Sequence, residues 1–180
     1  MRRFPLPKAA ASVLTALFFF AVFCAVVPSA SQAKVKFGLT KGYNPPPFTA
    51  KDVNGHEQSL ETYTGQVVVL HFWASWCPYC RGEIAKLMQL YQEKQVQIIA
   101  VSTDENVDVL KRFLEKVKLP YPVIADSQND FEISDQYAIS GIPVTFIINR
   151  DGTIFKRLNG SSDIVGTVKQ ALTQSSSKAT

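Results

Sequence analysis

The sequence predicts a single α/β domain with a mixed central sheet and helices on both faces of that sheet. Two apolar runs rich in β-branched residues, 66–74 and 96–103, have the composition of buried central strands. Segments with apolar residues at helical spacing follow each of these runs. Asp151-Gly152 then marks a tight turn, so the last two strands form an antiparallel hairpin. Alternating strands and helices that end in a hairpin require strands of both directions in one sheet.

The chain before the first central strand is expected to contain a linker and a hairpin. Residues 34–47 include three consecutive prolines, which favour an extended conformation and exclude helix, and they predict a Pro-rich linker. Asn54-Gly55 lies between two short extended segments and is typical of a β-hairpin turn. The domain itself is predicted over residues 40–173.

Helices are predicted wherever apolar residues recur three and four positions apart. The first helix continues to about residue 94 and buries one face formed by Ile84, Leu87, Met88 and Tyr91. A second helix is expected within 105–118, and a short third one within 129–139, after a short strand at 122–125. A closing helix over 161–172 would take Ser161 or Ser162 as its N-cap, and residues 174–180 would form a disordered polar tail.

Residues 1–33 have the order of features of a secretory signal peptide. A basic start is followed by an uncharged apolar run over residues 9–27, then by Pro28 and a small-residue cleavage site ending at Ala33. The alternative is an uncleaved membrane anchor, because the apolar run nearly spans a bilayer. Both interpretations predict export to the periplasm, and Cys24 would be discarded or inert.

Charge and cysteine content limit the possible functions of the exported part. The first 33 residues hold three of the 19 Lys and Arg residues and none of the 15 acidic ones, so the remainder is nearly neutral. A near-neutral domain lacks the basic surface of a nucleic-acid-binding protein. Cys77 and Cys80 are then the only cysteines left, in a compartment where thiols tend to be oxidised.

The spacing and position of Cys77 and Cys80 favour redox chemistry. Cys77 would lie at a helix N-terminus, where unpaired backbone N–H groups and the helix dipole favour the thiolate. The thiolate is the attacking species in thiol–disulfide exchange. Cys80, one helical turn later, is close enough to close a disulfide and release a bound partner.

Two other interpretations of the cysteine pair remain open on spacing alone. A purely structural disulfide would close a very small loop and would stabilise the fold little. A metal site would need further ligands, for which the exported part offers only His56 and His71 besides the cysteines. Transient Cu(I) binding by the two thiols is the stronger form of the metal interpretation.

Glu83 and Pro143 are the other candidate functional residues. Glu83 follows Cys80 by three positions and shares its side of the helix, so a partly buried carboxyl could exchange protons with Cys80. The alternative is an exposed Glu83 that complements the helix dipole. Pro143 enters an apolar strand without an N–H for the ladder, which either a cis bond or an ordinary trans proline at an edge would accommodate.

Two separated motifs, FWASWCPYCRGE (72–83) and GIPVTFIINRDG (141–152), resemble the thioredoxin superfamily. More narrowly, residues 42–173 resemble the TlpA/ResA-like thiol-disulfide oxidoreductases of the bacterial periplasm. The resemblance implies a thioredoxin-like fold with an N-terminal β-hairpin extension and a central insertion. It also implies an enzyme that uses no cofactor and no resident metal.

The resemblance also assigns roles to individual residues. Cys77 would be the attacking thiol, Cys80 the resolving thiol, and Glu83 the acidic residue that tunes them. The oxidised form would contain a Cys77–Cys80 disulfide. Pro143 would be the cis-proline. The residues expected to contact the substrate are Trp76, Pro78, Tyr79, Ile142 and Pro143.

Some positions depart from the patterns of related families. His71 stands where thioredoxin has a buried Asp and close relatives often have Asn, and we expect a partly buried neutral histidine of unassigned role. Leu70 and Ala74 stand where peroxiredoxins need Pro and Thr, which argues against peroxidase activity.

The function predicted from the sequence is the reduction of protein disulfides in the periplasm by a monomer, either free or tethered by residues 9–27. The resemblance implies disulfide-bearing substrate proteins such as apocytochrome c, and a thiol-transporting electron donor in the membrane. The alternatives are a disulfide oxidase or isomerase of the same fold, which the Pro78-Tyr79 dipeptide favours, and a Cu(I)-binding protein.

Overall fold

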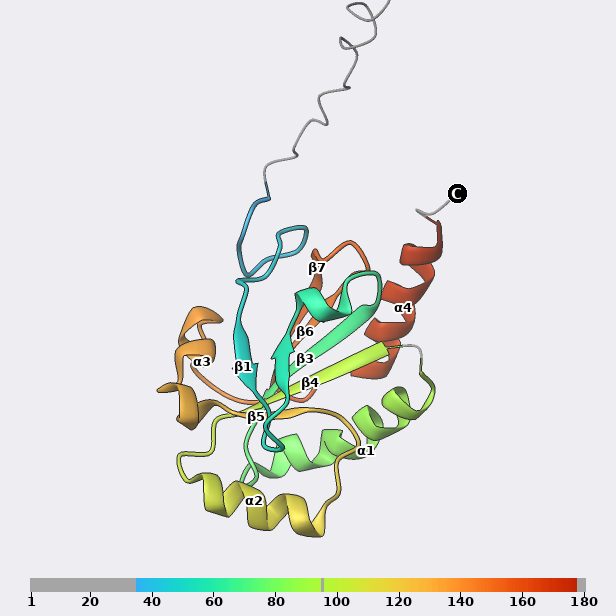
Figure 1. Cartoon of the computed structure of the whole chain (residues 1–180). Helices are drawn as coiled ribbons and strands as arrows, with labels where there is room; N and C mark the ends of the chain where they lie inside the picture. The colour runs from blue at the N-terminus through green and yellow to red at the C-terminus, as the bar shows by residue number, and fades with distance from the viewer. Residues whose placement is uncertain (1–34, 95, 178–180) are drawn as a thin grey trace, which may run out of the picture. The chain divides into compact units, whose positions relative to one another are not determined.

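A five-stranded sheet forms the centre of the computed structural model, which describes residues 35–94 and 96–177 (Figure 1). In spatial order its strands are β5 (Val123–Ala125), β4 (Val96–Ser102), β3 (Val67–Trp73), β6 (Val144–Ile148) and β7 (Ile154–Asn159). β3, β4 and β5 are parallel, whereas β6 runs antiparallel to both β3 and β7. The predicted mixed sheet is therefore confirmed.

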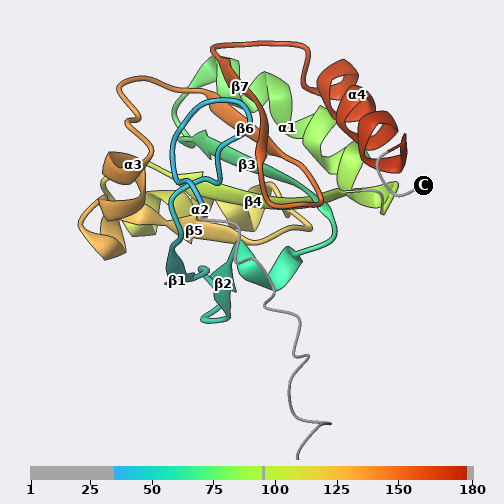
Figure 2. The same cartoon turned by 90° about the horizontal axis from the view of Figure 1, so that it is seen from above.

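Side chains of β3 alternate between two apolar clusters, one on each face of the sheet. Val67, Val69 and Trp73 belong to one cluster, and Val68, Leu70 and Phe72 to the other. The first cluster includes buried residues of α1 (Pro78–Gln92), α2 (Val107–Lys116) and α4 (Ile164–Ser177). The second includes residues of α3 (Glu132–Gln136) and β1 (Thr49–Lys51). Helices cover both faces, as predicted, and α4 lies beside α1 (Figure 2).

The predicted N-terminal hairpin is present as a separate two-stranded sheet. β1 pairs with β2 (Glu57–Ser59) in antiparallel register. Gly55 in the turn has a φ of 86°, a conformation that side chains disfavour. Two short 3₁₀ turns complete the described elements, Glu61–Tyr63 before β3 and Asp126–Asn129 after β5.

The segment predicted as a linker is instead bound to the domain. Ile154 of β7 exchanges two backbone hydrogen bonds of 2.8 Å with Gly42 and Tyr43. The hydroxyl of Tyr137 donates to the carbonyl of Pro46 at 2.7 Å. The prolines do make the segment extended, but β7 is an outer strand whose backbone groups are free to pair with it.

The C-terminal helix differs from the prediction at both ends. Its N-cap is Asp163, whose carboxylate accepts a hydrogen bond of 2.9 Å from the backbone N–H of Gly166. Ser162, one of the two predicted caps, uses its own N–H in a bond to Glu83. α4 then continues to Ser177, so the predicted disordered tail is wrong for residues 174–177. No proline or glycine follows Gly166 to end the helix, and residues 178–180 lie outside the described part.

The predicted signal segment, residues 1–33, with its apolar run and Cys24, also lies outside the described residues. Among the helices that the structure does describe, none combines the length and apolar character needed to cross a membrane.

Candidate active site

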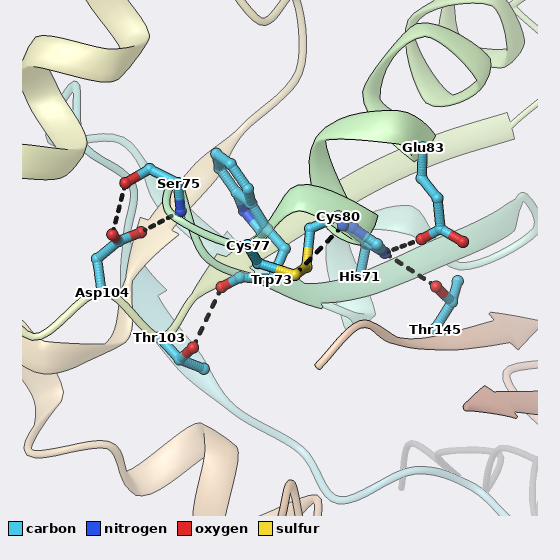
Figure 3. Close-up of a disulfide and its surroundings, with 9 residues drawn as sticks. All are labelled: His71, Trp73, Ser75, Cys77, Cys80, Glu83, Thr103, Asp104 and Thr145. Carbon is cyan, nitrogen blue, oxygen red and sulfur yellow. Dashed lines mark hydrogen bonds and ion pairs between the residues drawn. A yellow bond between two sulfur atoms is a disulfide. The ribbon is translucent and has the colours of Figure 1, made fainter. Parts of the chain in front are cut away.

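Cys77 and Cys80 lie where β3 gives way to α1, at the carboxyl end of the central strand (Figure 3). Cys77 is the N-cap of α1, with extended backbone angles, and Pro78 occupies the first turn. The two cysteines form a disulfide with a Cα–Cα distance of 5.3 Å. The backbone N–H of Cys80 donates to Sγ of Cys77 at 3.3 Å. The first turn of the helix thus directs an amide at the sulfur of Cys77, which lies at the helix N-terminus where the sequence placed it.

The two cysteine residues differ in access to solvent. Cys77 retains 4% exposure, whereas Cys80 is completely buried. Cys77 is therefore the more accessible cysteine of the pair. Trp76 and Tyr79 are 63% and 71% exposed and present aromatic surface on either side of Cys77 in the sequence.

A buried carboxylate anchors the loop that carries the cysteine pair. Asp104, directly after β4, accepts bonds of 2.8 Å and 2.6 Å from the N–H and the hydroxyl of Ser75. The same carboxylate accepts a bond of 2.6 Å from the hydroxyl of Ser102. Thr103 adds a backbone bond of 2.8 Å to the carbonyl of Trp73. Asp104 was not predicted from the sequence, although the carboxyl ends of the parallel strands β3 and β4 meet at one edge of the sheet.

Glu83 is buried inside the first turns of α1, with 1% exposure. The exposed alternative considered from the sequence is therefore wrong. One carboxyl oxygen accepts a hydrogen bond of 3.2 Å from the N–H of Ser162, and the other has no hydrogen-bond partner among the described residues. Burial raises the pKa of the Glu83 carboxyl, while the Ser162 hydrogen bond and the charge of Lys86 partly oppose that rise.

His71 faces Glu83 from the central strand (Figure 3). Its Nδ1 lies 2.9 Å from the hydroxyl of Thr145, the residue opposite it on β6. The same nitrogen lies 4.0 Å from Oε2 of Glu83. His71 is 2% exposed, and this burial lowers its pKa to about 4. The histidine is thus neutral at pH 7, as expected, but more deeply buried than predicted.

The burial of His71 predicts a loss of stability in acid. The unfolded chain protonates this histidine below about pH 6.5, but the folded protein resists protonation down to about pH 4. The stability that the buried neutral His71 contributes is therefore fully present above pH 6.5. As the pH falls to 4, the free energy of unfolding decreases by about 3 kcal/mol because of this histidine. Glu83 acts oppositely, because its raised pKa favours the folded state in acid. We expect the free energy of unfolding, measured in urea, to decrease more from pH 7 to pH 4 in the wild type than in His71→Asn. The difference between the two decreases is the contribution of His71.

The control for this prediction is His56→Asn, which changes the chain's other histidine on the exposed hairpin turn. The control variant should keep the loss of stability in acid that comes from His71. An equal pH dependence in wild type and His71→Asn would contradict the prediction.

A hollow borders the predicted substrate-binding proline. The Ile142–Pro143 peptide bond is cis, as the resemblance implies. Val144 pairs with Phe72 at the end of β3, so Pro143 lies at the same end of the sheet as the disulfide. Ile142 packs against the apolar cluster that contains both cysteines. The hollow has a volume of about 330 Å³, and its lining comprises Ser140, Gly141, Ile142, Pro143, Val144, Arg157, Asn159 and Gly160.

Arg157 contributes a fixed positive charge to this hollow, and the sequence analysis did not identify it. Its guanidinium lies 5.2 Å from the ring centre of Phe146 and donates to the carbonyl of Ala138.

In the described ranges, no three His, Cys, Asp or Glu side chains are placed to hold a metal ion.

Comparisons with known proteins agree with this geometry. The model of the AhpC/TSA family matches residues 42–157. Thiol-disulfide oxidoreductase ResA of Geobacillus thermodenitrificans is 31% identical over 129 residues, which cover 70% of this chain and 73% of the relative. Sporulation thiol-disulfide oxidoreductase A of Bacillus subtilis is 33% identical over 135 residues, covering 72% and 78%.

A solved structure also matches. It is described as a thiol:disulfide interchange protein DsbE from Chlorobium tepidum, with a TM-score of 0.66 and 29% identity over 75% of this chain and 99% of that one. With the disulfide at the helix N-terminus, these matches show that the chain belongs to the AhpC/TSA family of thioredoxin-like proteins and, within it, to the ResA-like thiol-disulfide oxidoreductases.

Proposed function

We propose that this oxidoreductase is exported and reduces disulfides of other proteins, with Cys77 as the attacking thiol. The observation that carries the proposal is the N-cap position of Cys77, where its sulfur accepts the N–H of Cys80. In the reduced protein the same amide and the helix dipole would stabilise a thiolate. Export is supported by the signal-like pattern of residues 1–33.

The proposed reaction starts from the dithiol form and moves two electrons to the substrate. The Cys77 thiolate attacks one sulfur of the substrate disulfide, and the other substrate sulfur leaves as a thiolate that takes up a proton. Cys80 then gives its proton to Glu83 and attacks the sulfur of Cys77. The bond between Cys77 and the substrate breaks, the second substrate sulfur leaves as a thiolate that takes up a proton from water, and the enzyme keeps the Cys77–Cys80 disulfide. A thiol-carrying donor must reduce this disulfide before the next cycle.

Glu83 fits the role of the internal proton acceptor. Its carboxyl is buried, one turn after Cys80 on the same helix, and one of its oxygens has no hydrogen-bond partner in the described structure. Because its pKa is raised, the carboxylate is a stronger base than an exposed glutamate would be.

The surface near Cys77 suits an extended protein segment as substrate. Trp76, Pro78 and Tyr79 are exposed beside the cysteines, and Ile142 and Pro143 border the neighbouring hollow. Apolar and aromatic surface of this kind binds the apolar side chains that folded proteins bury. We extend the proposal to apocytochrome c as a substrate class and to a membrane thiol donor, both implied by the family resemblance, with the enzyme acting as a monomer and without nucleic acid.

Reduction of insulin disulfides tests the catalytic assignment. The wild-type protein should accelerate insulin precipitation in the presence of dithiothreitol, and Cys77→Ser should reduce the rate to that of dithiothreitol alone. The reason is that serine cannot form the attacking thiolate. Wild-type acceleration that persists in Cys77→Ser would overturn the proposal.

Titration of the cysteine pair against glutathione tests the direction of electron transfer. A reductase should have a potential at or below about −220 mV, whereas a strong oxidant lies near about −120 mV. A value near the oxidant limit would replace the reductase proposal by the disulfide oxidase that the Pro78-Tyr79 dipeptide suggests.

A further inference from the structure

Three buried polar atoms around the disulfide have no hydrogen-bond partner in the described structure. They are Nε1 of Trp73 and, on two side chains that face each other, Nε2 of His71 and Oε2 of Glu83. Glu83 extends from α1 toward the ring of His71 on β3, so the last two atoms belong to one buried group of side chains (Figure 3). Buried polar atoms without partners are rare because each carries a desolvation cost. A pair of them beside a reactive sulfur suggests a functional reason.

The His71 ring is held in place from the sheet side. Thr145 lies directly opposite on β6, with its hydroxyl 2.9 Å from Nδ1. The other neighbour in the sheet register is Ala100 of β4, whose side chain offers neither a charge nor a hydrogen bond. Nδ1 is also the ring atom 4.0 Å from Oε2 of Glu83. The fixed ring therefore turns its hydrogen-bonded nitrogen toward the free carboxyl oxygen.

Few titratable groups face His71 from the elements around it. α1 presents Glu83 and Cys80, and its charged residues Arg81 and Lys86 are exposed. Within residues 164–174, the part of α4 whose side chains are described, the buried side chains carry no charge, and they are Ile164, Thr167, Val168 and Ala171. The Glu83 carboxyl also receives the N–H of Ser162 and the charge of Lys86, and His71 adds a buried polar side chain 4.0 Å from Oε2.

A neutral imidazole suits this position because one ring nitrogen carries a proton. With the proton on Nδ1, the ring donates to Thr145 and presents the positive end of the N–H dipole on the side of Glu83. An ionised carboxylate in a buried site depends on such dipoles far more than the neutral acid does. An apolar residue at position 71 would leave the carboxylate without this support.

We propose that His71 is a positioning residue for Glu83: held by Thr145, its neutral ring supports the free carboxyl oxygen and keeps Glu83 available as an ionised proton acceptor for Cys80. The inference rests on the proposed role of Glu83 in the resolving step. The ring itself takes up no proton. The proton that leaves Cys80 goes to Glu83, and the electron pair left on sulfur forms the new bond to Cys77.

Carboxyl ¹³C NMR of the oxidised full chain, labelled on glutamate, tests this inference. The Glu83 resonance is assigned as the one that disappears in Glu83→Gln. Replacing His71 by leucine should raise the midpoint of its titration by about one pH unit, because the ionised form loses its polar neighbour. Thr145→Val, which releases the ring, should produce a smaller shift in the same direction. His71→Asn keeps an amide donor and should stay near the wild-type midpoint.

A midpoint that is the same in wild type and His71→Leu would overturn the inference, even if the variant unfolds at a lower temperature, because a structural role affects only stability. If His71→Leu does not fold, an unchanged midpoint in Thr145→Val overturns it instead. As a second readout, the rate at which the mixed disulfide is resolved is measured against pH. Adding His71→Leu to the wild-type protein should shift this pH profile, whereas adding it to Glu83→Gln should not.

The same measurements separate this inference from the role proposed for Glu83. A resolution rate that Glu83→Gln leaves unchanged at every pH would refute that role, whereas a shift of the NMR midpoint would still show the coupling between His71 and Glu83. Loss of the insulin activity in Cys77→Ser is independent of both outcomes.

Discussion

Replacing Cys80 by serine should leave the enzyme covalently bound to its substrate. Cys77 keeps its position at the N-cap of α1 and can still attack a substrate disulfide. The second step fails because serine supplies no thiolate to attack the mixed disulfide. Reduced Cys80→Ser mixed with insulin should therefore accumulate an adduct, visible by mass spectrometry and released by dithiothreitol, while turnover stops.

The matched control is Cys77→Ser, in which the remaining thiol belongs to the fully buried Cys80. This variant should form little adduct under the same conditions. Adducts that form mainly through Cys80 would reverse the assignment of attacking and resolving thiols.

Replacing Asp104 by alanine should destabilise the fold by about 4 kcal/mol, because three buried donors on Ser75 and Ser102 lose their acceptor. The carboxylate also anchors the loop before Cys77, so the rate of attack should fall as the loop becomes less ordered. Urea unfolding measures the stability, and alkylation of the reduced protein measures the reactivity of Cys77.

Glu105→Ala changes an exposed acidic neighbour and serves as the control, with an expected change within about 0.5 kcal/mol. If Asp104→Ala is no less stable than this control, the hydrogen bonds to Ser75 do not support the active-site loop.

The elements that could be predicted are those encoded by neighbouring residues. The apolar runs of β3 and β4, the Asn54-Gly55 turn and the helical spacing after Cys80 each depend on a few adjacent positions. The extension of α4 and the binding of residues 42–43 to β7 were not predicted. The binding of residues 42–43 depends on distant backbone groups of β7, which local composition does not reveal. The extension of α4 was missed because a polar composition suggested disorder, although no proline or glycine after Gly166 ends the helix.

The same distinction explains what was predicted of the active site. Cys77, Cys80 and Glu83 lie within seven consecutive residues, so their spacing on a helix was enough to relate them. The partners that define their environment are distant in sequence. Thr145 is 74 residues from His71, and Ser162 is 79 residues from Glu83. The sequence could suggest that Glu83 has a function, but only the folded chain shows what surrounds its carboxyl.

The coverage of the outer strands has a consequence for how this enzyme selects its substrates. The segment at Gly42 and Tyr43 occupies backbone groups of β7, and the N–H of Val53 binds the carbonyl of Val123 on β5, the opposite outer strand. A protein that meets partly unfolded chains would otherwise offer them two free edges for strand addition. With these positions occupied, an incoming chain cannot add as a strand there, so the proposed binding falls to the surface around Cys77, where its disulfide must be presented.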